Sequence, residues 1–227
     1  MIPIHDTIPS RRWPVVNYAL IGLCAWAFWL ELSAGADVDV FVNQHALVPV
    51  RFVKSLENGG FGLGVFAPFV SSMFLHAGFG HFAGNMLFLW IFGDNVEDRL
   101  GHVSYALFYL VGGVAAGAVH VFANPASTVP TVGASGAIAA VMGAYMLMYP
   151  SARIVTLVIV IFLVRTIEVP AFAWLGLWFV FQVLSSTFEQ SSEGGGVAWF
   201  AHIGGFAFGA VVALLLGLRG APRSRLV

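Results

Sequence analysis

Long runs of apolar residues without Asp, Glu, Lys or Arg dominate this sequence. The clearest example is the 22-residue run Gly101–Phe122. The hydrocarbon core of a bilayer is about 30 Å thick, and a helix needs about 20 apolar residues to cross it. Only 9% of the 227 residues are charged, whereas a soluble domain carries about a quarter. The chain is therefore expected to be an integral membrane protein whose spans are helical.

Six apolar segments are interpreted as spans, which predicts an all-α, six-helix bundle in the membrane. The membrane domain covers 15–218, between a polar leader (1–14) and a basic tail (219–227). The segment Ile154–Val164 is too short to cross a bilayer, and its β-branched residues favour an extended or interfacial segment. The six predicted spans are 15–32, 69–92, 101–122, 134–149, 170–188 and 197–218.

The basic residues indicate the orientation of these spans. Six spans place both termini on one side of the membrane. Most Lys and Arg residues then fall on that side, and only Arg51 and Lys54 lie opposite. Basic loops are retained in the cytoplasm, so we expect both termini to be cytoplasmic in a multi-pass protein of a bacterial plasma membrane. The residues on the terminal side are Arg11, Arg12, Arg99, Arg153, Arg165, Arg219, Arg223 and Arg225.

Composition also removes several classes of function. The formal net charge is −1, and no basic cluster of the size needed for nucleic acid occurs. Cys24 is the only cysteine, which excludes disulfides and cysteine metal sites. His-Glu-x-x-His is absent, and His76 and His81 are five residues apart, a spacing that does not place them on one helix face. No metal site is expected.

The segment Gly133-Ala134-Ser135-Gly136-Ala137 has two interpretations. Small residues let membrane helices approach closely, and taken alone the segment is better explained in this way. The other interpretation is a serine nucleophile, with Gly133 and Gly136 leaving room for the backbone of a substrate. The rest of the chain must decide between them.

Polar side chains on three separate spans favour the second interpretation. In the six-span arrangement Ser135, His202, His81 and Asn85 all fall in the outer half of the membrane. Ionisable groups inside spans are costly and mark functional sites. A serine hydroxyl needs a base to become a good nucleophile, and imidazole, which titrates near neutrality, can supply it. No Asp or Glu lies on a span at this depth, so His202 and Ser135 would form a dyad.

Acyl transfer also requires hydrogen-bond donors for a developing oxyanion. The backbone N–H of Ser135 lies near a helix N-terminus and is one candidate. The side-chain amide of Asn85 and the ring N–H of His81 are the others, and their i,i+4 spacing places them on one helix face.

These motifs together resemble those of the rhomboid family of intramembrane serine proteases. His76–Asn85 is similar to the family's histidine–asparagine signature, Gly133–Gly136 to its nucleophile motif and Ala201–Gly205 to its base motif. The resemblance implies a Ser135–His202 dyad, oxyanion donors at His81 and Asn85, and cleavage of single-span membrane proteins without cofactor or metal. In some bacterial members a tyrosine four residues after the nucleophile supports the histidine ring. Ala139 stands here, which leaves open what braces His202.

Two other classes of function remain as alternatives. One is a catalytically inactive rhomboid-like protein that binds membrane clients, although both Ser135 and His202 are present. The other is a small-solute transporter, whose polar residues would line the full depth of the bilayer. The polar residues here lie in one half, and no inverted repeat is visible.

Overall fold

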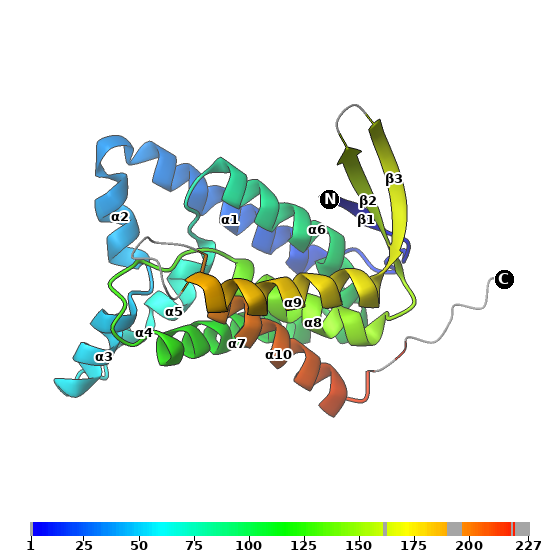
Figure 1. Cartoon of the computed structure of the whole chain (residues 1–227). Helices are drawn as coiled ribbons and strands as arrows, with labels where there is room; N and C mark the ends of the chain where they lie inside the picture. Colours follow the sequence, from blue (N-terminus) through cyan, green and yellow to red (C-terminus); the bar gives the residue numbers. More distant parts are fainter. Residues whose placement is uncertain (1, 161–162, 190–196, 219, 221–227) are drawn as a thin grey trace.

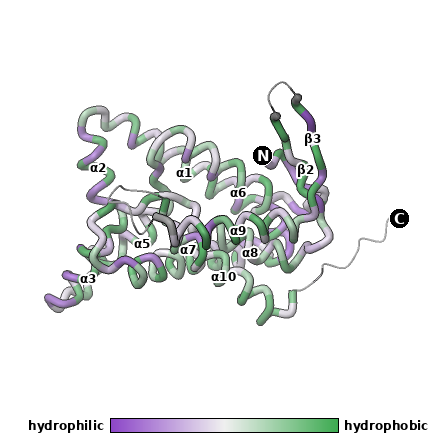
Figure 2. The backbone as a smooth tube through the Cα atoms, in the orientation of Figure 1, coloured by the Kyte–Doolittle hydropathy of each residue, from purple (hydrophilic) through white to green (hydrophobic). Residues whose placement is uncertain are grey.

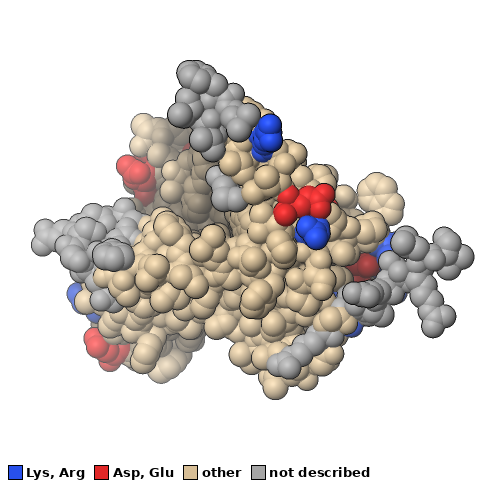
Figure 3. All heavy atoms as spheres, turned by 45° about the vertical axis from the view of Figure 1, so that its right-hand side comes forward, with Lys and Arg blue, Asp and Glu red and all other residues tan. Residues whose placement is uncertain are grey.

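The computed structural model describes residues 2–160, 163–189, 197–218 and 220. Most of these residues form a bundle of helices that lie lengthwise beside one another, with a small sheet at one end (Figure 1). Figure 2 shows apolar residues along most of the bundle, and Figure 3 shows a face on which Lys, Arg, Asp and Glu are sparse. The principal helices are α1 (Val15–Ser33), α6 (Phe79–Leu100), α7 (His102–Ala123), α8 (Ser135–Met148), α9 (Ala171–Glu189) and α10 (Trp199–Leu215).

The described helices differ in whether they are long and apolar enough to cross a membrane. By length and composition α1 and α7 can each cross a bilayer. The chain 63–74 and α6 pass the same test only as a pair bent by 83°. Helices α8, α9 and α10 are apolar but shorter, and α8 is buried along almost its whole length by its neighbours. A short helix that other helices surround can begin below the membrane surface, because protein covers its ends.

The chain between α1 and α6 is folded. It consists of short helices, and it reaches the bundle through Phe69, which is buried against α7. A continuous helix does not begin at residue 69, where the second span was predicted to start. These helices are η1 (Gly35–Asp37), α2 (Val38–His45), α3 (Pro49–Glu57), α4 (Leu63–Phe66), α5 (Pro68–Ser71) and η2 (Ser72–Phe74).

A turn at 75–78 sets the true start of α6. The backbone N–H of His76 donates to the buried carboxylate of Glu31, on α1, at 3.0 Å. Gly78 then has a φ of +138°, a conformation that glycine adopts without steric penalty. The turn bends the chain sharply, so α6 begins at Phe79, ten residues after the predicted start.

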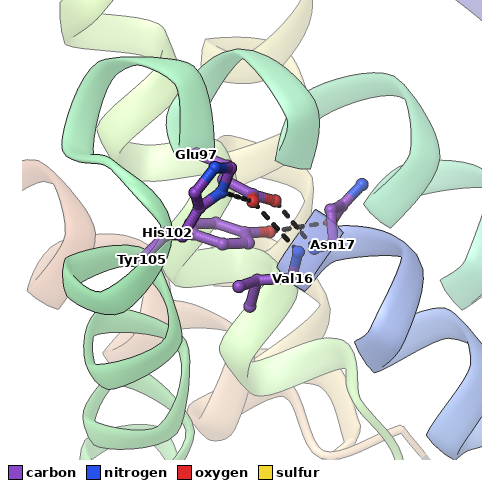
Figure 4. A network of polar contacts seen from close by, with 5 residues as sticks. All are labelled: Val16, Asn17, Glu97, His102 and Tyr105. Carbon is purple, nitrogen blue, oxygen red and sulfur yellow. Dashed lines mark hydrogen bonds and ion pairs between the residues drawn. The ribbon is translucent and has the colours of Figure 1, made fainter. Parts of the chain in front are cut away.

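Helix α6 also extends beyond the predicted end of the second span. Helix α6 does not stop at residue 92 but continues to Leu100, and Glu97 is buried rather than in water. Its carboxylate accepts the backbone N–H groups of Val16 at 3.0 Å and Asn17 at 2.7 Å (Figure 4). It also lies 2.5 Å from the ring of His102. Because α1 has no side-chain cap of its own, Glu97 satisfies the free N–H groups at its start.

A three-stranded antiparallel sheet corrects the all-α prediction. Its strands are β1 (Ile2–Asp6), β2 (Arg153–Val160) and β3 (Leu163–Pro170), in the order β1-β2-β3. Within the segment 154–164, for which an extended or interfacial structure was predicted, residues 154–160 and 163–164 lie in strands, and residues 161–162 lie outside the described residues. We refer to β2 and β3 together as the hairpin. The leader contributes β1, which the sequence did not predict.

The side chain of Asp6 ties the first strand to the helices. Its carboxylate accepts hydrogen bonds from the hydroxyl of Tyr145 and, at 3.1 Å, from the amide of Asn95. Burial raises the pKa of Asp6 to about 6. The predicted tail 219–227, apart from residue 220, lies outside the described residues.

Candidate active site

Three helices begin at the same end of the bundle, and their first turns carry the polar residues singled out from the sequence. His81 is the third residue of α6, Ser135 is the first residue of α8 and His202 is the fourth residue of α10. Asn85 follows one helical turn after His81. We call this end of the bundle the serine end. The first N–H groups of each helix lack partners within the helix and favour negative charge nearby.

Ser135 and His202 are in direct contact. The Oγ atom of Ser135 lies 2.8 Å from Nε2 of His202, a hydrogen-bonding distance. His202 is only 8% exposed, whereas Ser135 is half-buried. The two residues are 67 positions apart in sequence, so this pairing depends on how closely α8 and α10 pack.

Glycines make that close packing possible. A Cβ atom at Gly205 would overlap the backbone carbonyl oxygen of Gly136, and one at Gly209 would overlap that of Ala140. Gly143, on α8, faces the carbonyl of Phe206 in the same way. Gly205 and Gly209 therefore let α10 approach α8 closely.

The glycines beside the serine have different surroundings from those expected. Gly133 has a φ of +127°, and a Cβ there would lie 2.7 Å from the ring of His81. The absent side chain thus makes room for His81. Gly136 is buried, and a Cβ there would lie 2.8 Å from Ala116 on α7. Gly136 thus faces a neighbouring helix, and its role in leaving room for a substrate backbone stays a prediction.

His81 and Asn85 each present a donor near Ser135. The Nδ1 atom of His81 accepts the backbone N–H of Ala77 at 3.2 Å, so its neutral ring carries the proton on Nε2. Nε2 and the adjacent Cε1 are the ring atoms that lie beside Gly133. The Nδ2 atom of Asn85 is buried and has no hydrogen-bond partner among the described residues. Unpaired buried donors are rare in folded proteins, and one in a cavity is ready for a ligand.

A pocket of about 980 Å³ joins these groups. It is lined by Ser135, His202, His81 and Asn85, together with the loop 126–132 that leads into α8. Its volume lies at the upper end of the range for ligand sites. Among the described residues, His, Cys, Asp and Glu nowhere gather in a group of three that could hold a metal.

The surroundings of His202 answer the question that Ala139 left open. Oε1 of Gln182, on α9, lies 2.7 Å from Nδ1 of His202, and Gln182 is only 4% exposed. The ring of Trp178 lies 5.8 Å from the imidazole at an interplanar angle of 36°. The ring of Trp199 meets it edge-on at 6.2 Å. Ala139 instead faces Gly205.

Comparison with known proteins identifies the family. The family model described as "Rhomboid domain" matches residues 64–219, which include the helices α6 to α10 and every residue of the site. The chain belongs to the rhomboid family. Its rhomboid domain thus begins just before the turn that sets His81 and ends just beyond α10.

Curated rhomboid proteins from several kinds of organism are similar to the chain. "RHOMBOID-like protein 12, mitochondrial" of Arabidopsis thaliana is 28% identical over 92% of this chain and 67% of its own length. "Rhomboid protease GluP" of Bacillus subtilis is 31% identical over 90% of this chain and 35% of its own length. "Rhomboid protein 1, mitochondrial" of Saccharomyces cerevisiae is 29% identical over 62% of this chain and 39% of its own length. The chain therefore spans well under half the length of two of these relatives.

Sequence reasoning missed Gln182 in this rhomboid protein. The sequence carried one signal for it, since Gln182 is the only amide side chain in the aromatic-rich segment 170–188. A buried amide in a membrane helix needs a partner. Nothing in the spacing of residues along the chain indicated that the partner would be His202.

Proposed function

We propose that this rhomboid protein is an intramembrane serine endopeptidase, which hydrolyses peptide bonds in or near the transmembrane segments of other membrane proteins. The observation that carries the proposal is the 2.8 Å contact between Ser135 Oγ and His202 Nε2 inside the pocket. Nucleophile and base within hydrogen-bonding distance are the geometric signature of covalent catalysis by serine.

The chemistry follows from the placement of these atoms. Ser135 Oγ attacks the carbonyl carbon of the scissile bond while His202 Nε2 takes the hydroxyl proton. The resulting oxyanion accepts hydrogen bonds from the Ser135 N–H, His81 Nε2–H and Asn85 Nδ2. His202 then gives its proton to the leaving amine as the C–N bond breaks. A water molecule, with His202 again as base, hydrolyses the acyl-enzyme and restores Ser135.

The proposal includes the arrangement in the membrane. Six crossings would place both termini in the cytoplasm and the serine end in the outer half of a bacterial plasma membrane. The substrates would be single-span membrane proteins that reach the site from the surrounding lipid. The residues named above perform each step without a metal or a cofactor.

A cleavage assay tests the proposed function. We expect the purified protein, reconstituted in phospholipid vesicles, to cut a panel of single-span proteins that have Gly or Pro near the membrane boundary. A fluorophosphonate should become attached to Ser135, as read by mass spectrometry of the labelled peptide, because it mimics the tetrahedral intermediate. A folded protein that binds these proteins but neither cuts any of them nor reacts with the reagent would support the client-binding alternative instead.

A further inference from the structure

We propose that Gln182 is a positioning residue that fixes the tautomer and the plane of His202, so that Ser135, His202 and Gln182 act as one unit. This proposal rests on the proposed function. Two contacts define the unit: Gln182 Oε1 lies 2.7 Å from His202 Nδ1, and His202 Nε2 lies 2.8 Å from Ser135 Oγ. Gln182 and His202 are both buried, at 4% and 8% exposure.

The chemistry of a neutral imidazole explains why the partner is an amide oxygen. One ring nitrogen carries a proton and the other a lone pair. To take the proton of Ser135, Nε2 must hold the lone pair, which leaves the proton on Nδ1. Gln182 Oε1 accepts that proton. With the amide oriented as it is here, the other tautomer would place the lone pairs of Nδ1 and Oε1 face to face and leave a buried group without its partner.

A neutral amide also suits the depth of the site. When His202 takes the proton of Ser135 it becomes cationic, and the negative end of the Gln182 amide dipole stabilises that charge. An aspartate would do so more strongly, but a carboxylate buried within a membrane domain is costly before the reaction begins. Among the described residues, the titratable groups around His202 are His81 on α6 and His120 on α7.

Helix α9 fixes His202 in two directions. Trp178 and Gln182 are spaced i,i+4 and share one face of α9. Gln182 holds the ring by an in-plane hydrogen bond, and Trp178 lies 5.8 Å from it across a tilted face. The base is thus oriented from α9 and not from α8, where Ala139 offers only a methyl group.

Two substitutions of Gln182 test this role. In Gln182→Leu, which keeps the size of the side chain, we expect kcat to fall by about 10² or more with KM within about threefold, because His202 no longer favours the required tautomer. In Gln182→Glu the carboxylate stabilises the protonated ring, so activity is retained in part and its acidic limb moves to higher pH. Val183→Leu, on an exposed position of the same helix, is the matched control and should match wild type.

A measurement without substrate separates this proposal from the proposed function. The ¹⁵N chemical shifts of labelled histidine report which nitrogen of His202 is protonated. We expect Nδ1 to carry the proton in wild type and the two tautomers to mix in Gln182→Leu. Unchanged shifts, or a Leu variant with wild-type kcat and pH profile, would overturn the positioning role. An inactive wild type with the expected shifts would count against the proposed function alone.

We also infer, from an independent observation, that the two strands of the hairpin lie in the head-group layer of the membrane. The hairpin joins the last turn of α8 to the first turn of α9, so it lies at the end of the bundle opposite Ser135. Figure 1 shows it running crosswise to the helices and reaching beyond them. If the helices cross the bilayer, the hairpin extends along its surface.

The side chains of the hairpin fit that location. No Asp, Glu, Lys or Arg occurs between Arg153 and Arg165. Ile159 and Val164, which pair across the strands, are 58% and 60% exposed, and Ile167 on the opposite face is 42% exposed. A sheet in water usually exposes one polar face. Here apolar side chains are exposed on both faces, and burial of these side chains in lipid would be favourable.

The charged residues of the hairpin indicate that a lipid surface, and not a second protein, covers its exposed apolar side chains. At the base of the hairpin Arg153 lies 3.8 Å from Glu168, and both side chains are more than half exposed. Arg165, which lies on β3 further from the base than Glu168, is also exposed. An arginine beside exposed apolar residues matches an anionic phosphate next to acyl chains. The occupant is therefore an anionic phospholipid leaflet.

Fluorescent labels on the hairpin test the inference. In a Cys24→Ala background, the environment-sensitive dye NBD is attached to Ile159→Cys or, as the matched control on the same face near the base, to Glu168→Cys. In phosphatidylglycerol-containing vesicles we expect a blue shift and quenching by doxyl-labelled lipid at position 159, and exposure to aqueous iodide at 168. Equal exposure to iodide at both positions would overturn the inference. So would shielding at 159 without lipid quenching, which would indicate a protein partner.

Discussion

Replacing either Ser135 or His202 with alanine is expected to reduce cleavage at least about a thousandfold, and replacing both should cost no more than the larger single loss. The two side chains share one hydrogen bond of 2.8 Å. Without His202 the hydroxyl keeps its proton, and without Ser135 the imidazole has no nucleophile to activate. Residues that act as a unit therefore give strongly non-additive effects. The measurement is kcat/KM for a single-span substrate in vesicles.

Controls for this experiment come from the same end of the molecule. Ser33 ends α1 and His45 ends α2, and both are exposed outside the pocket. Ser33→Ala and His45→Ala should keep the activity of wild type. Circular dichroism must show that the Ser135 and His202 variants remain folded. Additive losses in the double variant, or a Ser135→Ala variant that cleaves like wild type, would contradict the dyad.

The main elements of the fold could be predicted from the sequence, but where α6 begins and ends could not. Apolar runs located each principal helix, since a membrane requires them whatever the neighbours are. The start of α6 depends on a hydrogen bond from the His76 backbone to Glu31, 45 residues away. Its extension to Leu100 depends on burial of Glu97 against the start of α1. These are tertiary contacts, and no local pattern encodes them.

The residues of the site also divide into those that the local sequence indicates and those whose role depends on tertiary packing. Ser135, His202, His81 and Asn85 could be found because each is a polar residue in an apolar segment, and the predicted spans place all four at a similar depth. Gln182 stood in such a segment too, but its role depends on how α9 packs against α10. The strand β1 was missed for a similar reason, because it is stabilised by pairing with β2, about 150 residues later.

The close packing of α8 and α10 leads to the largest expected effect on stability. We expect Gly209→Ala to destabilise the protein by about 3 kcal/mol, at the upper end for overpacking. The added Cβ would overlap the backbone carbonyl oxygen of Ala140, which no side-chain rotation can move. Gly22→Ala, on α1, is the control, because its Cβ would meet nothing within 4 Å. Thermal unfolding in detergent, followed by circular dichroism, measures the difference.

A second glycine facing Ala140 makes this prediction specific to the backbone contact. A Cβ at Gly112, on α7, would lie 2.8 Å from the Cβ of Ala140 rather than against its carbonyl. Ala140→Gly should therefore restore stability to Gly112→Ala, since it removes the atom in conflict. The same change cannot rescue Gly209→Ala, whose conflict is with an oxygen that glycine also carries. Separation of α8 from α10 in Gly209→Ala should in addition lengthen the Ser135–His202 contact and lower cleavage. Equal rescue of both variants by Ala140→Gly would contradict this prediction. It would show that the conflict in Gly209→Ala is with the side chain of Ala140 and not with its backbone.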